Sequence, residues 1–146
     1  MATNYLDTHT TLMNTINTLI TSTGTFNTVS FRDDVPAAFG GPLPACIVKT
    51  LQINPKAGAS GYIGYECEIA IIVMKNYTNS VYQDINTLLK SVMNIIDSSA
   101  SFYTTPKIEK HNWGSVRYST RDIDPSYGGI CLGQIILNVQ WTDYNA

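Results

Sequence analysis

The sequence has 146 residues, 44% of them hydrophobic and 14% charged, with a formal net charge of −2. This length predicts a single domain, residues 1–146, which buries enough apolar surface to fold without disulfides or metal ions. The nine lysines and arginines are spread along the chain, so the clustered positive charge that tight nucleic-acid binding requires is missing. A surface rich in threonine and asparagine replaces the missing charges, which fits either a compositional bias or extensive contacts with other subunits.

The first predicted element is a helix that begins near Tyr5. Its apolar residues recur at spacings of three and four, and Gly24 lies just beyond its end. The stripe comprises Tyr5, His9, Leu12, Met13, Ile16, Leu19 and Ile20. Two strand candidates follow at Phe26–Phe31 and Ala45–Ile53, separated by the loop Arg32–Pro44, which is rich in proline and glycine.

The centre of the chain shows the clearest pattern. Asn54–Gly61 is predicted to be a hairpin tip, and the strand Tyr62–Met74 follows it with alternate apolar residues on one face. The next helix carries an apolar stripe at Val81, Ile85, Leu88, Val92 and Ile95 and runs to about Asp97. Thr78 or Ser80 can cap its start, and Gln83 would complete a capping box with Ser80.

The last third is predicted to contain two strands. Ser98–Pro106 reads as a polar turn, Lys107–Tyr118 as a strand with weak alternation, Ser119–Gly129 as a loop and Ile130–Tyr144 as the last strand. The resulting order, α-β-β-β-α-β-β, predicts an α+β fold. We expect an antiparallel or mixed sheet of four to five strands with both helices packed on one face.

The predicted sheet is apolar on both faces. Ile72 and Met74 lie opposite the apolar face of their strand, and Leu132 and Ile136 do the same in the last strand. A strand with one face in water alternates more cleanly than this. Leaving these side chains exposed would forgo several kcal/mol at about 25 cal/mol per Å² of apolar area. We therefore expect a loop of the same chain or a neighbouring subunit to cover them.

No set of residues indicates catalysis. His9 and His111 are the only histidines, and neither has a carboxylate or cysteine at a spacing that completes a metal site. An enzyme would have to use His111, Asp122, Asp124 or Cys131. We predict no catalytic, cofactor or metal site. Aromatic residues concentrate toward the C-terminus, where core packing and interface contacts explain them equally well: Trp113, Tyr118, Tyr127, Trp141 and Tyr144.

Cysteine usage and hydropathy indicate a protein that folds in a reducing compartment and does not enter a membrane. Cys46, Cys67 and Cys131 each sit inside a predicted strand and form no Cys-x-x-Cys pair, so buried thiols are expected. Met1–Ile20 lacks the features of a secretory signal. The longest apolar run, Ile69–Met74, is too short to span a bilayer.

The order and lengths of these elements resemble the tail terminator (tail completion) proteins of tailed bacteriophages. The resemblance covers nearly the whole chain, and it is one of pattern rather than of a short motif. It includes the N-terminal helix, the segment Pro44–Val48, the strand Glu66–Met74, the helix Ser80–Asp97 and the closing strand Ile130–Trp141. Phage neck proteins and other small ring-forming virion proteins share this pattern.

The resemblance implies a structural virion protein of the tail and neck, assembled in the host cytoplasm and without cofactors. Its copies would form a ring at the head–tail junction, typically a hexamer, that stops growth of the tail tube and presents a face to the head connector. Genomic DNA would pass through the lumen without tight binding. The alternative, from a different functional class, is a small regulatory domain that holds a ligand between its helices and its sheet.

We place subunit contacts on the second sheet face, at Ile72, Met74, Leu132 and Ile136. The loops Arg32–Pro44 and Asn54–Gly61 are expected to reach the tail tube or the connector. The residues predicted to make these contacts are Phe39, Pro42, Lys56 and Ser60.

Overall fold

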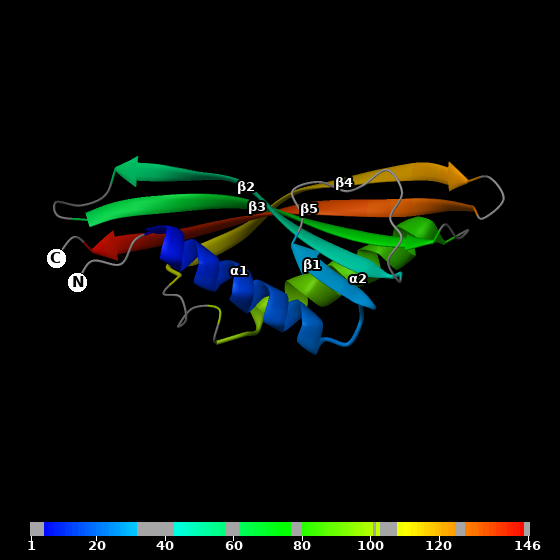
Figure 1. Cartoon of the computed structure of the whole chain (residues 1–146), viewed down its shortest axis with the longest axis horizontal. Helices are drawn as coiled ribbons and strands as arrows, with labels where there is room; N and C mark the ends of the chain where they lie inside the picture. Colours follow the sequence, from blue (N-terminus) through cyan, green and yellow to red (C-terminus); the bar gives the residue numbers. More distant parts are fainter. Residues whose placement is uncertain are drawn as a thin grey trace.

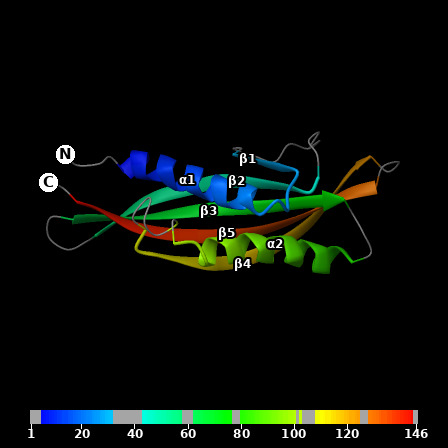
Figure 2. The same ribbon diagram turned by 90° about the horizontal axis from the view of Figure 1, so that it is seen from below.

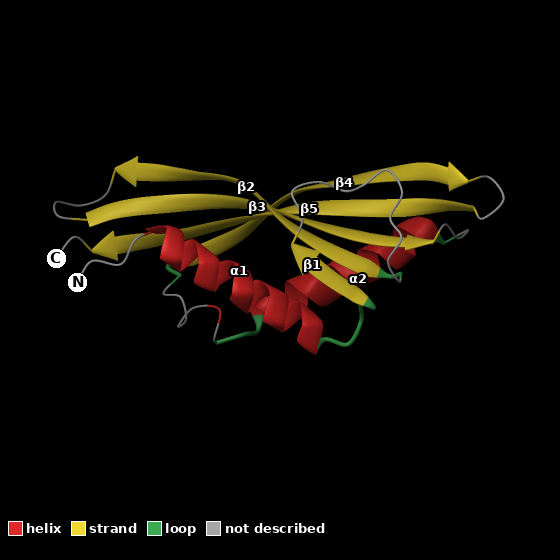
Figure 3. Cartoon of the chain, in the orientation of Figure 1, coloured by secondary structure: helices red, strands yellow, loops and turns green. Residues whose placement is uncertain are grey.

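The computed structural model describes residues 5–31, 43–57, 62–76, 80–100, 102, 108–124 and 128–144. Within these ranges two helices and five strands follow the order α-β-β-β-α-β-β (Figure 3). The predicted α+β fold is therefore confirmed. No helix in the described part of the chain has both the length and the hydropathy that a membrane span requires.

All five strands belong to one mixed sheet with the spatial order β1-β2-β3-β5-β4. Only β1 and β2 are parallel, and every other neighbouring pair is antiparallel. The strands are β1 (Thr28–Phe31), β2 (Ala45–Ala57), β3 (Tyr62–Asn76), β4 (Lys110–Asp124) and β5 (Gly128–Tyr144). The central pair β3–β5 stays in register along its whole length, from Tyr62 opposite Tyr144 to Asn76 opposite Ile130.

Both helices lie on one side of this sheet, as predicted (Figures 1 and 2). Helix α1 (Tyr5–Ser22) lies nearer β1 and β2, and α2 (Val81–Asp97) lies nearer β4 and β5 (Figure 2). Gly24 follows α1 with φ of 67°, the left-handed conformation in which glycine ends a helix. Its N–H donates to the carbonyl of Thr21 at 3.2 Å.

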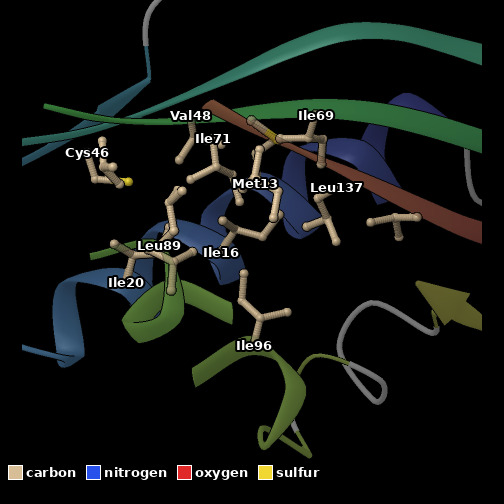
Figure 4. Close-up of a cluster of buried hydrophobic side chains, with 14 of the residues drawn as sticks. Met13, Ile16, Ile20, Cys46, Val48, Ile69, Ile71, Leu89, Ile96 and Leu137 are labelled. Carbon is tan, nitrogen blue, oxygen red and sulfur yellow. The ribbon is translucent and has the colours of Figure 1, made fainter. Parts of the chain in front are cut away.

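Between the helices and the sheet lies the main hydrophobic core (Figure 4). Met13, Ile16 and Ile20 of α1 meet Leu89 and Ile96 of α2 and the inner face of the sheet. The sheet contributes a row of buried side chains that includes Cys46, Val48, Ile69, Ile71 and Leu137. Each fully buried side chain of this size contributes about 1.5–3 kcal/mol. Helix α1, which is rich in threonine, therefore depends on this packing more than on its intrinsic helicity.

Helix α2 approaches β5 closely at Gly133. A Cβ atom placed on Gly133 would lie 2.2 Å from Cγ2 of Ile85 and 3.4 Å from Cδ1 of Leu89. Carbon atoms in contact normally lie about 3.5–4.0 Å apart, so only glycine fits here without a shift of the Ile85 side chain or of the helix. Gly133 thus sets the distance between α2 and the sheet.

The structure corrects several predicted strand boundaries. The loop predicted at Ser119–Gly129 is wrong over much of its length, because β4 continues to Asp124 and β5 begins at Gly128. The local turn signals mark only the end of a long hairpin, since pairing with β5 holds residues 119–124 in the sheet. In the same way, β2 extends through Ala57 because it pairs with β3 as far as Ile63.

The capping box predicted for α2 is also wrong. Ser80 is the N-cap residue, but its side chain makes no capping hydrogen bond. Asp84 in the first turn provides the negative charge that suits a helix N-terminus.

Candidate subunit interface

The second face of the sheet carries the four residues predicted to contact a neighbouring subunit. Three of them, Ile72, Met74 and Leu132, are only 6%, 1% and 5% exposed in the single chain. They form a small cluster with Ala45, Ile47 and Ile130, and Leu43 packs against it. Because one chain buries these side chains itself, their apolar character does not require a second subunit. Ile136 lies outside this cluster and is partly exposed, so its contact with a neighbour stays a prediction.

Toward the end of β2 and the start of β3 the second face is polar. Gln52 of β2 lies opposite Glu68 of β3, and its side-chain amide donates to the Glu68 carboxylate. Further along, the Lys56 ammonium lies 2.6 Å from the Glu66 carboxylate. Glu68 is hydrogen-bonded and Lys56 is ion-paired with Glu66 while these side chains stay accessible to water, so this part of the face favours water over an apolar partner surface.

Of the four residues predicted to lie on partner-contacting loops, only Lys56 is within the described ranges. It belongs to the strand β2 rather than to a hairpin tip, and the ion pair with Glu66 holds its side chain against β3. Phe39, Pro42 and Ser60 lie outside the described residues.

Large exposed hydrophobic side chains lie toward the two edges of the sheet. Near the β2 edge, Leu6 and Leu51 are 51% and 46% exposed. Both lie next to the contact between His9 of α1 and Thr50 of β2. Leu6 precedes His9 by almost one helical turn, and Leu51 directly follows Thr50, where the register of β2 shifts. Near the β4 edge, three more side chains are exposed: Tyr82 (65%), Val116 (39%) and Tyr118 (43%).

The side chains near the β4 edge form one ordered surface. The rings of Tyr82 and Tyr118 meet edge to face with centroids 5.3 Å apart. The Tyr118 hydroxyl donates to the side-chain oxygen of Asn86 at 2.5 Å, which ties β4 to α2. We call Tyr82, Val116 and Tyr118 the β4-edge patch, and Leu6 and Leu51 the β2-edge patch. Of these residues, the sequence indicated only Tyr118, in an aromatic group that core packing and interface contacts explained equally well. Tyr82 lies outside the buried stripe of α2 and could have signalled an exposed apolar residue.

His111 takes part in contacts that hold the end of α2 against β4. Its Nε2 lies 2.7 Å from Oδ1 of Asp97, and the same oxygen accepts a hydrogen bond from Trp113 Nε1 at 2.9 Å. The His111 ring also meets Phe102 edge to face at 5.1 Å. This cluster fastens the last residue of α2 to β4.

The residues required for the enzyme alternative are not brought together where the structure describes them. His111 lies opposite Val139 and Cys131 lies eight residues earlier on β5, which is about 27 Å along a strand. The side chains of Asp122 and Asp124 lie outside the described part of the structure. No group of three or more potential metal ligands occurs among the described residues.

His9 links α1 to β2. Its Nε2 lies 2.8 Å from Oγ1 of Thr50, whose hydroxyl also lies 3.4 Å from Sδ of Met13. Burial lowers the pKa of His9 below its usual 6.5, because burial disfavours the charged imidazolium. The neutral ring therefore suits this contact.

All three cysteines are buried thiols, as predicted. Burial raises the pKa of Cys46 and of Cys67 to about 12, and it also raises the pKa of Cys131. A thiol that stays protonated at neutral pH is a poor nucleophile and a poor metal ligand.

One cavity of about 430 Å³ lies at the start of α2 and the end of β3. Polar and apolar residues line it, among them the ion pair of Lys75 and Asp84, whose Nζ and Oδ2 atoms lie 3.1 Å apart. Other lining residues are Leu43, Pro44, Asn76, Thr87 and Leu88. Its volume is within the range of small-molecule sites.

Comparison with known protein families and with curated proteins finds no match for this sequence.

Proposed function

We propose that this chain is a structural virion protein of a tailed bacteriophage. Its copies form a ring at the head–tail junction that terminates the tail tube and joins it to the head connector. The observation that carries the proposal is the order α-β-β-β-α-β-β folded into one sheet with both helices on a single face. This is the kind of fold that the resemblance to tail terminators implies. The proposed role is assembly and involves no catalysis.

The charge distribution supports passage of DNA through such a ring without tight binding. Lys56 and Lys75 are each paired with a carboxylate of the same chain, Glu66 and Asp84 respectively. The net charge of −2 gives the chain no overall attraction for phosphates. DNA can therefore slide past such a surface.

Mass measurement by light scattering, with and without isolated tail tubes, tests the proposal. A hexamer would have a mass of about 97 kDa, six times the 16.1 kDa of one chain. The expected result is a closed ring, in solution or on the tube end, that electron microscopy of the same sample shows as a cap. A chain that stays monomeric at high concentration and does not bind tail tubes would refute the proposal.

The second candidate is a small ligand-binding domain, and the cavity beside Lys75 and Asp84 is the observation that favours it. This candidate predicts that a metabolite stabilises the protein by about 2.7 kcal/mol at one hundred times its dissociation constant. A thermal-shift screen against metabolites measures this effect. The Lys75→Met variant is the control, because it should lose the response of any ligand that uses the ion pair.

A further inference from the structure

In the part of the chain that the structure describes, the sheet has an unpaired long edge on each side. β4 is the last strand of the sheet and pairs only with β5 in the described structure. On the opposite side, β1 pairs with Ala45–Val48 alone, so Lys49–Ala57 of β2 has no strand beyond it among the described residues. Exposed strand edges carry unpaired backbone N–H and C=O groups that readily bind another strand.

Each of these edges also has an apolar patch beside it. The β2-edge patch is aliphatic and the β4-edge patch is largely aromatic. The large exposed hydrophobic side chains of the described residues all belong to these two patches. The patches differ in composition and lie on opposite sides of the sheet, so they suit a contact in which one surface meets a different surface of the next copy.

We infer that copies of this chain associate edge to edge, with the β4 edge of one copy against the β2 edge of the next. This inference rests on the proposed ring and identifies its subunit contact. A ring is built from such head-to-tail contacts, because each copy must present two different surfaces. A two-fold dimer would instead use one surface twice.

Strand direction supports this arrangement. From β2 to β4 the neighbouring strands alternate, since β2–β3, β3–β5 and β5–β4 are all antiparallel. β4 therefore runs opposite to β2. When copies stand side by side around an axis, with their strands tilted to it so that Val116 comes level with Leu51 of the next copy rather than with Val48, β4 and the next copy's β2 are again antiparallel. The alternation then continues from copy to copy, so the sheet can extend through the ring.

Side chains must contribute to this contact along with the backbone. The register of β2 shifts at Leu51, and Pro55 has no N–H to donate, so the β2 edge offers only a short ladder. The β4 ladder is likewise interrupted between Trp113 and Val116. Removal of the two apolar patches from water supplies the remaining attraction. It favours contact between these two edges over contact of either edge with a polar surface.

Charge substitutions at the two edges test the inference. Leu51→Lys blocks the β2 edge and Val116→Lys blocks the β4 edge, while Asn94→Lys adds the same charge on an exposed part of α2 as the control. Each edge variant alone should be monomeric by light scattering, with an unchanged circular dichroism spectrum. The control should assemble as the unsubstituted chain does.

Mixing the two edge variants is the decisive measurement. Each variant keeps the edge that the other has lost, so an equimolar mixture retains one intact contact. The expected product is a dimer of about 32 kDa, twice the chain mass, and nothing larger. Where the unsubstituted chain forms rings in solution, edge variants that still assemble like it would overturn the inference, and so would a mixture that stays monomeric.

Cross-linking provides a readout if the contact is weak in solution. Copies carrying Leu51→Cys, mixed with copies carrying Val116→Cys, should be joined by a flexible bis-maleimide, whereas either variant alone should give few cross-linked dimers. The native thiols stay silent because they are buried. If rings form on tail tubes but the mixed pair gives no cross-link, the edge contact is wrong and the proposed function stands. If no rings form at all, the proposed function fails.

Ile136→Asp separates the edge contact from the contact predicted on the second face. Edge association predicts that this variant keeps the mass of the unsubstituted assembly. If it abolishes assembly while the two edge variants assemble normally, the second face is the interface and the edge contact is refuted.

Discussion

Gly133→Ala is expected to destabilise the protein because the added methyl group occupies space that Ile85 fills. The new Cβ would lie 2.2 Å from Cγ2 of Ile85, and contact distances of about 3.5 Å or more are normal between carbon atoms. Overpacking of this kind costs about 1–3 kcal/mol. Replacing glycine within a strand returns about 0.5–1 kcal/mol, because the unfolded chain loses freedom. The balance is a net loss of up to about 2.5 kcal/mol in the free energy of unfolding, with a middle value of about 1 kcal/mol.

A second glycine of the same sheet provides the matched control. A Cβ on Gly64 of β3 would meet its nearest neighbour, Cβ of Lys56, at 3.7 Å, which is an ordinary contact. Neither Gly64 nor Gly133 has positive φ, so alanine fits the backbone at both positions. Gly64→Ala should therefore leave stability unchanged or raise it by up to about 1 kcal/mol.

The clash with Ile85 can be tested directly with a double-mutant cycle. Ile85→Ala alone should cost about 2–5 kcal/mol by emptying part of the core. In the Gly133→Ala background it should cost about 1–2 kcal/mol less, because the alanine methyl group then has room. Urea unfolding followed by circular dichroism, at one low protein concentration, gives all four stabilities. If Gly133→Ala is as stable as Gly64→Ala, or if the two substitutions are additive, the close packing of α2 on β5 is not what fixes glycine here.

Three further predictions concern the titrating and polar groups. Burial lowers the pKa of His9 in the folded state, so the unfolded chain binds more protons near pH 6.5. The free energy of unfolding should therefore be constant above that pH and fall below it. His9→Gln, which can still form a hydrogen bond with Thr50, should flatten this dependence in urea titrations. An unaltered slope in the His9→Gln variant would assign the acid sensitivity to other groups. Asp97→Ala leaves the ring N–H groups of His111 and Trp113 without their shared acceptor and should lower the free energy of unfolding by about 1–3 kcal/mol. Asp97→Asn keeps an oxygen there and should cost less. Equal losses of stability in the two variants would show that hydrogen bonding does not account for the contact. The three cysteines should react with a thiol reagent only as fast as the protein unfolds, and rapid labelling of any of them in the native protein would contradict their burial.

Local patterns were sufficient to predict the elements and their order. The alternation at Ile69, Ile71 and Val73 and the helical spacing at Ile85, Leu88 and Val92 place these residues in the main core, as found. Such periodicities are visible in sequence because a strand or helix with one buried face repeats its apolar residues at a fixed interval. The α+β class and the helices on one face follow from that order.

Long-range pairing determined the parts that sequence patterns missed. Residues 119–124 look like a loop by composition, yet they form part of β4 because β5 offers a partner along the whole hairpin. The alternation at Ile72, Met74 and Leu132 left open whether the same chain or a neighbouring subunit covers them, and contacts within one chain bury them. Neither outcome is encoded in a short window, because it depends on which segments the sheet brings side by side.

What the sequence determined by itself is therefore the identity of the elements, the main core and the buried state of the thiols. Tertiary structure alone decided the strand order β1-β2-β3-β5-β4, and with it which edges remain unpaired and which apolar side chains, such as Tyr82, Val116 and Leu51, stay in water. The physical reason is that hydrophobic periodicity reports only whether a side chain is turned toward some apolar surface. Which surface that is, and whether it belongs to the same chain, depends on contacts between residues far apart in the sequence.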